Sequence, residues 1–132
     1  MKIGWIGFHI EGLEALRTAL AQKAPIHAVL TLEPALAARR SGTADYQSVC
    51  SEFRVPLYRI RNINDQDSLA ILQRLSLDLA FVIGWTQLVG PEAMALVRSG
   101  MIGAHASLLP SLRGRAPINW ALIRACGRRV IR

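Results

Sequence analysis

The chain has 132 residues, of which 52% are hydrophobic, 19% charged and 6% aromatic, and its mean hydropathy is +0.27. This length and composition predict one folded domain with an aliphatic core and exclude an intrinsically disordered chain. The net charge of +7 alone does not indicate nucleic-acid binding, because four of the arginines lie in the last nine residues, RACGRRVIR, and no groove-reading motif accompanies them.

Apolar runs and helical patterns alternate from the N-terminus onward. Residues 2–8 predict a strand, and leucines at helical spacing predict a helix over 11–22. A second apolar run, 26–32, predicts another strand. The small and polar segment 33–44 is expected to be an excursion and not a core element.

The same alternation continues to the end of the chain. Residues 77–84, LDLAFVIG, are nearly all apolar and predict a central parallel strand that is buried on both faces. The other predicted elements are helices at 45–54, 66–75, 90–100 and from 117, and strands at 55–60 and 101–107. This order predicts a Rossmann-like, doubly wound α/β fold with a mainly parallel sheet in three layers.

The sequence is also typical of a reduced, cytoplasmic protein. Cys50 and Cys126 are far apart and show no metal-ligand spacing, so no metal site is expected. The opening MKIGWIGFHIEGLEA is interpreted as a buried strand and not as a signal peptide. No apolar run approaches the roughly 18–20 residues that cross a bilayer, so no membrane partner is expected.

Ligands of doubly wound folds bind at the carboxyl ends of the strands. The first loop at this edge, from Gly7 to Gly12, lacks the G-x-G-x-x-G spacing, which argues against a nicotinamide or flavin site. Gly7 and Gly12 either offer backbone N–H groups to an anion or are required sterically by the turn. His9 either reaches a ligand or has a capping or solvent-facing role.

The second loop, GWTQLVG at 84–90, follows the most apolar predicted strand. Taken alone, Trp85 is expected to be a packing residue. The alternative is that the backbone of the turn, whose polar groups cannot all pair in a sheet, binds a flat heteroaromatic ligand beside apolar walls.

The third loop holds the strongest candidate for chemistry, His105, which can accept or donate a proton near neutral pH. Ser107 follows it, and Leu108-Leu109-Pro110 stiffens the turn. Arg113-Gly114-Arg115 then either grips a phosphate or carboxylate or forms a solvated basic loop.

Three stretches resemble the signature of the folate-dependent formyltransferase catalytic domain: His105-Ala-Ser-Leu-Leu-Pro, Arg113-Gly-Arg-Ala-Pro and Asn119-Trp-Ala-Leu. The turn at 84–88 with Pro91-Glu92 resembles the folate-binding loop of that family, whose members include methionyl-tRNA, glycinamide ribonucleotide and sugar-nucleotide N-formyltransferases. The resemblance runs from the first strand to about Ala125. It implies transfer of a formyl group from 10-formyltetrahydrofolate, as co-substrate, to a primary amine.

The resemblance also implies the roles of individual residues. The catalytic positions are His105, Ser107 and Gly103, which stands where the family has an Asn. The cofactor-binding positions are Ile83, Gly84, Trp85, Thr86, Gln87 and Leu88. The substrate-binding positions that it implies are Arg113, Gly114, Arg115 and Asn119. Gly7, His9 and Gly12 are further expected substrate-binding positions, because the first loop lies at the carboxyl ends of the strands.

Two departures from the family pattern affect the expected activity. Gly103 removes an amide donor, whose loss typically costs ~10²–10³ in rate. The chain also ends before the region in which the family carries the Asp partner of the histidine. Residues 1–132 are therefore expected to form a single, incomplete N-terminal part of the catalytic domain, lacking its last strands and weakly active or inactive.

Three functions remain open. The motif leans toward a nucleotide-linked amino sugar as acceptor, and methionyl-tRNA is the alternative, although a nucleic-acid partner is not expected from charge. The third is a non-catalytic folate- or nucleotide-binding domain. An uncovered apolar sheet edge and a partly uncovered helix at 117–123 are expected to favour aggregation or pairing into a homo-oligomer.

Overall fold

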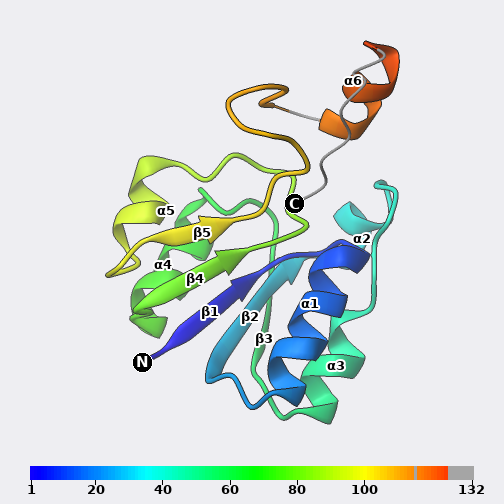
Figure 1. The fold of residues 1–132 in the computed structure, drawn as a ribbon. Helices are drawn as coiled ribbons and strands as arrows, with labels where there is room; N and C mark the ends of the chain where they lie inside the picture. The colour runs from blue at the N-terminus through cyan, green and yellow to red at the C-terminus, as the bar shows by residue number, and fades with distance from the viewer. Residues whose placement is uncertain (115, 125–132) are drawn as a thin grey trace.

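The computed structural model describes residues 1–114 and 116–124. Its centre is a parallel sheet of five strands in the order β3-β2-β1-β4-β5 (Figure 1). The strands are β1 (Ile3–Ile6), β2 (Ile26–Leu32), β3 (Leu57–Ile60), β4 (Leu79–Val82) and β5 (Met101–Gly103).

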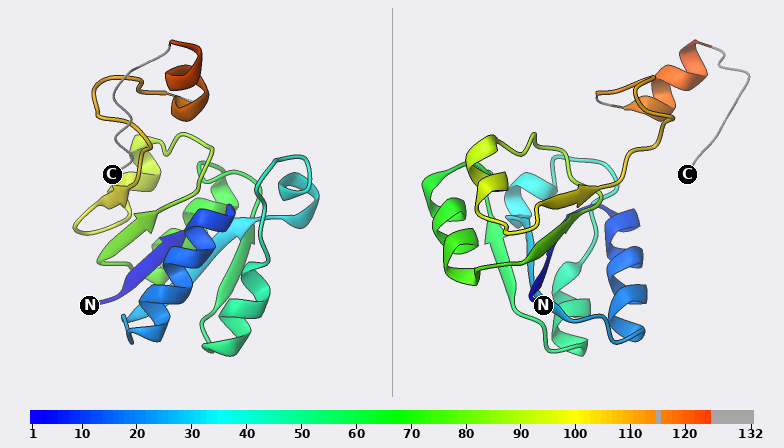
Figure 2. Two further views of the ribbon diagram at one scale, coloured as in Figure 1. Left: turned by 45° about the vertical axis from the view of Figure 1, so that its right-hand side comes forward. Right: turned by 60° about the vertical axis from the view of Figure 1, so that its left-hand side comes forward.

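Helices cover both faces of this sheet, so the predicted Rossmann-like α/β/α architecture is confirmed (Figure 2). The helices α1 (Ile10–Ala21) and α3 (Tyr46–Glu52) lie on one face, and α4 (Gln66–Leu75) and α5 (Pro91–Ala95) on the other. The predicted excursion contains the single-turn helix α2 (Pro34–Ala37), and α6 (Pro117–Ile123) follows the third loop.

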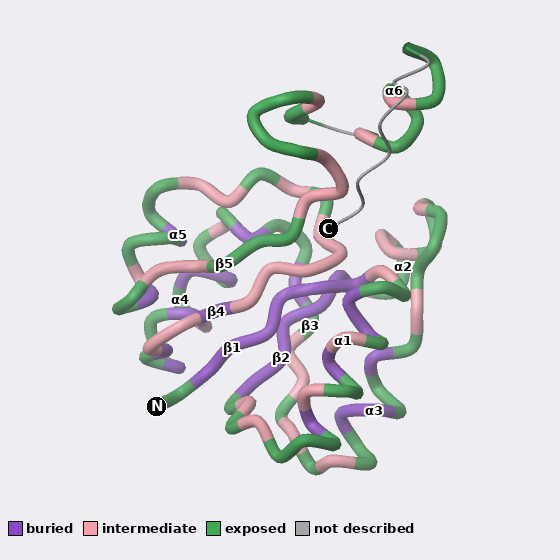
Figure 3. The backbone as a smooth tube through the Cα atoms, viewed as in Figure 1, coloured by how far each residue is buried: buried purple, intermediate pink, exposed green. Residues whose placement is uncertain are grey.

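The core consists of two apolar clusters, one on each face of the sheet. On the α1 and α3 side, Trp5 packs with Leu16 and Tyr46. On the α4 and α5 side, Ile6 packs with residues that include Leu72. Alternation along β1 sends neighbouring side chains to opposite faces, and Figure 3 shows the buried residues concentrated in β1 and β2.

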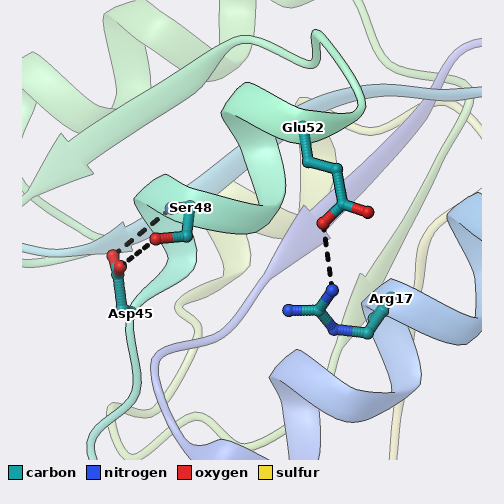
Figure 4. A network of polar contacts seen from close by, with 4 residues as sticks. All are labelled: Arg17, Asp45, Ser48 and Glu52. Atoms are coloured by element: carbon teal, nitrogen blue, oxygen red, sulfur yellow. Dashed lines mark hydrogen bonds and ion pairs between the residues drawn. The ribbon is translucent and has the colours of Figure 1, made fainter.

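Polar side chains define where α3 begins and how it meets α1 (Figure 4). The Asp45 carboxylate accepts hydrogen bonds from the backbone N–H of Gln47 at 3.0 Å and from the Ser48 hydroxyl. The side-chain hydrogen bond from Ser48 is the main cause that lowers the pKa of Asp45. Arg17 of α1 pairs with Glu52 of α3 at 3.0 Å. Asp45 is therefore the N-cap of α3, which confirms the predicted start of this helix.

The structure corrects two details of the predicted strands. The prediction that 77–84 is buried on both faces is wrong, because Leu79, Phe81 and Val82 of β4 are only half-buried. The neighbouring Ile102 of β5 is 50% exposed, so the sheet face at β4 and β5 is incompletely covered. The strand predicted at 101–107 ends at Gly103, since the chain leaves the sheet before His105.

Helix α6 stands away from the three-layer body (Figure 2). Its large apolar side chains are exposed, as predicted for this helix: Ile118, Trp120, Leu122 and Ile123. Among the helices in the described part of the chain, none has the length and apolar character needed to cross a membrane.

Candidate active site

The pairing of β4 with β5 brings two predicted site loops together. Val82 is the register partner of Gly103, and the Ala104 N–H approaches the Val82 carbonyl at 3.4 Å. Because the strands are parallel, the turn that starts at Gly84 and the segment that starts at His105 leave the same edge of the sheet side by side (Figure 1).

The first predicted loop does not present free backbone N–H groups to an anion at its start. Four consecutive N–H groups donate to backbone carbonyls: Gly7 to Leu30 at 3.1 Å, Phe8 and His9 to Gly84 at 3.1 and 3.2 Å, and Ile10 to Gly42 at 2.8 Å. These groups hold the turn against β2, the end of β4 and the excursion.

Close packing explains why this turn contains Gly7 and Gly12. A Cβ at Gly7 would lie 2.5 Å from the Ile83 carbonyl oxygen and 2.7 Å from the Tyr46 hydroxyl. At Gly12 the corresponding distances are 2.3 and 2.6 Å. The steric alternative therefore accounts for both glycines without a bound anion.

His9 lies where three loops meet. A Cβ at Gly42, which has φ +72°, would lie 1.7 Å from His9 Nε2, and one at Gly84 would lie 2.9 Å from His9 Cβ. His9 Nδ1 is 3.7 Å from a carboxylate oxygen of Glu11. The side chain of His9 therefore packs the excursion against the first turn, and it does not act as a side-chain cap of α1.

In the second loop, the Trp85 side chain packs into the protein. It is half-buried against the core cluster on the α4 and α5 side. Its ring lies edge-on to that of Phe8, with 6.2 Å between the ring centres. Its buried Nε1 has no hydrogen-bond partner within residues 1–114 and 116–124. The packing interpretation of this side chain is therefore the one that the structure favours.

Gln87 is directed toward the loop between β3 and α4. Its Oε1 accepts from the Ile63 N–H at 2.9 Å, and its Nε2 donates to the Arg61 carbonyl at 2.8 Å. The neighbouring side chains of Thr86 and Leu88 are exposed, Leu88 by 91%. The amide predicted to bind cofactor is thus occupied by backbone partners.

Sequence reasoning missed a second residue in this contact, Asn64. Its Nδ2 donates to the Leu88 carbonyl at 2.8 Å, and its Oδ1 accepts from the Gly90 N–H at 2.6 Å. No local pattern in the sequence reveals a contact with a residue 26 positions away.

His105 is half-buried, and its Nε2 lies 3.1 Å from the Leu112 carbonyl oxygen. A carbonyl oxygen only accepts hydrogen bonds, so this contact requires the proton on Nε2 and makes Nδ1 the basic nitrogen of the neutral ring. Ser107 closes the same loop by donating from Oγ to the Ser111 carbonyl at 2.7 Å. Backbone carbonyls of the loop therefore fix the orientation of the His105 and Ser107 side chains.

Gly103, at the position of the family Asn, has room for a side chain. Among the described residues, a Cβ there would meet only the Val82 carbonyl oxygen, at 3.6 Å, which is an ordinary van der Waals distance. Neither packing nor a positive φ explains this glycine.

The predicted acceptor residues lie further out. Arg113 lines an open pocket of about 400 Å³ with Pro110, Leu112, Trp120 and Arg124, and the Arg124 guanidinium lies 5.5 Å from the centre of the Trp120 ring. Gly114 and Asn119 are exposed, and Arg115 lies outside the described residues. In the part of the chain that the structure describes, no three His, Cys, Asp or Glu residues gather as a metal site.

Comparison with known proteins identifies the family. The formyl transferase family model matches residues 10–129. A methionyl-tRNA formyltransferase from Pelotomaculum thermopropionicum is 27% identical over 125 residues, which are 93% of this chain and 40% of that protein. One from Acidothermus cellulolyticus is 31% identical, over 93% of this chain and 39% of that protein. The chain thus spans about two fifths of these curated relatives.

A solved structure supports the fold assignment. Phosphoribosylglycinamide formyltransferase from Bacillus halodurans has a TM-score of 0.73 at 20% identity, and the match covers 95% of this chain and 66% of that chain. The sequence motif, the parallel sheet and the matched family model agree, and this chain belongs to the formyl transferase family.

Proposed function

We propose that this chain supplies the folate-binding part and the proton-transferring histidine of a formyl-transfer site, which moves a formyl group from 10-formyltetrahydrofolate to a primary amine. One observation carries the proposal: the 84–90 turn and His105 leave adjacent parallel strands at the same edge of the sheet. Two groups so placed can address one reacting centre.

The second loop fits a flat heteroaromatic co-substrate through its backbone. Within the described residues, no hydrogen bond involves the backbone N–H or C=O groups of Trp85, Thr86 and Gln87. Such groups suit the donor and acceptor edge of a pterin ring. In this proposal Gln87 contributes its backbone, because its side-chain amide is occupied.

The role assigned to His105 follows from its tautomer. Nucleophilic attack forms a bond between the amine nitrogen and the formyl carbon, and the amine must lose a proton. With Nε2–H donated to Leu112, His105 Nδ1 takes that proton and can return it to the leaving nitrogen as the bond to the carrier breaks. The co-substrate supplies only the formyl group.

Gly103 favours a second candidate function. Without an amide at this position, negative charge on the formyl oxygen loses one hydrogen-bond donor. A domain that binds folate without turning it over is therefore the alternative, and it predicts binding with no transfer.

The acceptor belongs to the same proposal. The curated relatives described above are methionyl-tRNA formyltransferases, which favours methionyl-tRNA over the nucleotide-linked amino sugar that the motif suggested. The pocket formed with Arg113, Trp120 and Arg124 suits either acceptor, because guanidinium groups bind phosphate and an aromatic ring stacks on a base.

Two measurements on the chain test the proposal. Titration with 10-formyl-5,8-dideazafolate, followed by tryptophan fluorescence, should show saturable binding. Transfer is measured by incubation with 10-formyltetrahydrofolate and either methionyl-tRNA or an amino-sugar nucleotide; any formylated amine, even at the low rate expected of this chain, should form at least 100-fold more slowly in His105→Ala. The control His27→Ala changes an exposed histidine of β2 and should leave this rate unchanged.

The outcomes separate the candidates. Saturable binding without transfer to any amine supports the non-catalytic domain. Absence of binding rejects a folate site, and a rate that survives His105→Ala rejects the role of His105.

A further inference from the structure

Two side chains join the 84–90 turn to the loop between β3 and α4: Asn64 from that loop and Gln87 from the turn itself. Asn64 and Gln87 make four hydrogen bonds between the turn and residues 61–64, at donor–acceptor distances of 2.6–2.9 Å. We call this pair of side chains the amide clamp. Each side-chain amide both donates and accepts a hydrogen bond. The turn therefore cannot shift relative to residues 61–64 without breaking at least one of these bonds.

The base of the clamp is itself fixed. Ile63 donates its N–H to Gln87 and directly precedes Asn64. Its side chain is fully buried in the core cluster on the α4 and α5 side. Asp65 follows and caps α4 by accepting from the Ser68 N–H at 2.8 Å. The clamp therefore attaches an irregular turn to a loop whose position is fixed by the core and by the start of α4.

The clamp also explains Gly90. A Cβ at this position would lie 2.8 Å from Asn64 Oδ1, the atom that accepts the Gly90 N–H. Any side chain here would push the amide away and release this end of the turn.

The clamp leaves unused the backbone that directly precedes its attachment points at Gln87, Leu88 and Gly90. The peptide groups of Trp85 and Thr86 make no hydrogen bond within residues 1–114 and 116–124, yet they are bounded by Gly84, whose carbonyl accepts two N–H groups, and by the Gln87 side chain. Free polar groups in a fixed geometry bind a ligand without a further ordering cost.

We propose that Asn64 and Gln87 are positioning residues, which hold the 84–90 turn in the conformation that binds the heteroaromatic ring of the folate. This inference rests on the proposed function. It assigns Asn64 a role that the family motif does not contain, and it gives the Gln87 side chain the task of supporting the turn while the Gln87 backbone stays in the proposed binding site.

The first experiment examines the clamp without any ligand. Hydrogen exchange of backbone amides in the chain should show protection at Gly90 and Ile63. Asn64→Ala should accelerate exchange at Gly90, and Gln87→Ala at Ile63, each at least tenfold. The matched control Gln73→Ala, on the exposed side of α4, should change neither rate. Unchanged exchange in both clamp variants would overturn the clamp.

The second experiment measures affinity for 10-formyl-5,8-dideazafolate. Asn64→Ala and Gln87→Ala should each raise Kd about tenfold, whereas Leu20→Ala, which removes a core contact at the far end of α1, should lower stability and leave Kd unchanged. If the clamp variants exchange faster but bind as tightly as the wild type, or if Leu20→Ala weakens binding equally, the positioning role is wrong.

A wild-type chain that does not bind this probe would reject the proposed function and, with it, the role in folate binding. The exchange rates would still report whether the amide clamp exists, so the two failures are distinguishable.

Discussion

The hydroxyl of Tyr46 donates a hydrogen bond of 3.0 Å to the backbone carbonyl of His9, 37 residues earlier in the chain. Tyr46 begins α3 and His9 precedes α1, so this contact joins the start of the two helices on one face of the sheet. Tyr46 is 2% exposed. Burial raises the pKa of its hydroxyl well above the usual value, and the group remains a neutral donor.

Tyr46→Phe should destabilise the protein by about 0.5–1.5 kcal/mol, because the hydrogen bond to the His9 carbonyl is lost while that carbonyl keeps the Leu13 N–H as a partner. The free energy of unfolding in urea measures this loss. Tyr58→Phe, at a half-buried tyrosine of β3, is the control and should change it by less than about 0.5 kcal/mol. Equal effects of both substitutions would show that the hydroxyl contact contributes nothing specific.

Gly12→Ala should be more damaging, although alanine usually favours a helix. Its Cβ would lie 2.3 Å from the Ile83 carbonyl oxygen, which is backbone and cannot move aside cheaply. We expect overpacking to lower the free energy of unfolding in urea by about 1–3 kcal/mol or more. Gly103→Ala, where the nearest atom is 3.6 Å away, should cost much less, and the reverse order would contradict the packing described for this turn.

Gly103→Asn tests whether the missing amide limits chemistry. The open space at Gly103 predicts a normally folded variant. If the proposed formyl transfer operates, the restored amide should raise its rate by ~10²–10³, measured with 10-formyltetrahydrofolate and methionyl-tRNA. Gly103→Ala adds bulk without a donor and should not raise the rate. An Asn variant no faster than the Ala variant would show that another group already stabilises the oxyanion.

Cys50 predicts a loss of stability at alkaline pH. Burial raises the pKa of its thiol from 9.0 to about 11, so the unfolded chain ionises first as pH rises. The neutral thiol stabilises the fold fully below pH 9, and this contribution is lost progressively between pH 9 and pH 11. Linkage allows a change of up to about 2–3 kcal/mol over this interval.

Urea unfolding of the wild type and of Cys50→Ala at a series of pH values isolates this contribution, because other alkaline groups titrate in both proteins. The wild type should lose more stability than Cys50→Ala between pH 8 and pH 11. Parallel curves for the two proteins would exclude the thiol as the cause.

The sequence by itself predicted the layers and the loops that matter. Alternating apolar runs and helical leucine spacing report local burial, which is why β1, α1 and β2 lie where the patterns placed them. The His105 motif identified the family that the comparison confirms. These features are encoded in neighbouring residues, and neighbouring residues are what a sequence displays.

Only the tertiary structure decided what individual side chains contact. The packing role of Gly12 depends on Ile83 and Tyr46, and the direction of the Gln87 amide depends on Arg61 and Ile63. The incomplete burial of β4 likewise depends on which elements cover the sheet, not on how apolar the strand is. Contacts between residues tens of positions apart leave no local periodicity, so they become visible only when the strands are placed side by side.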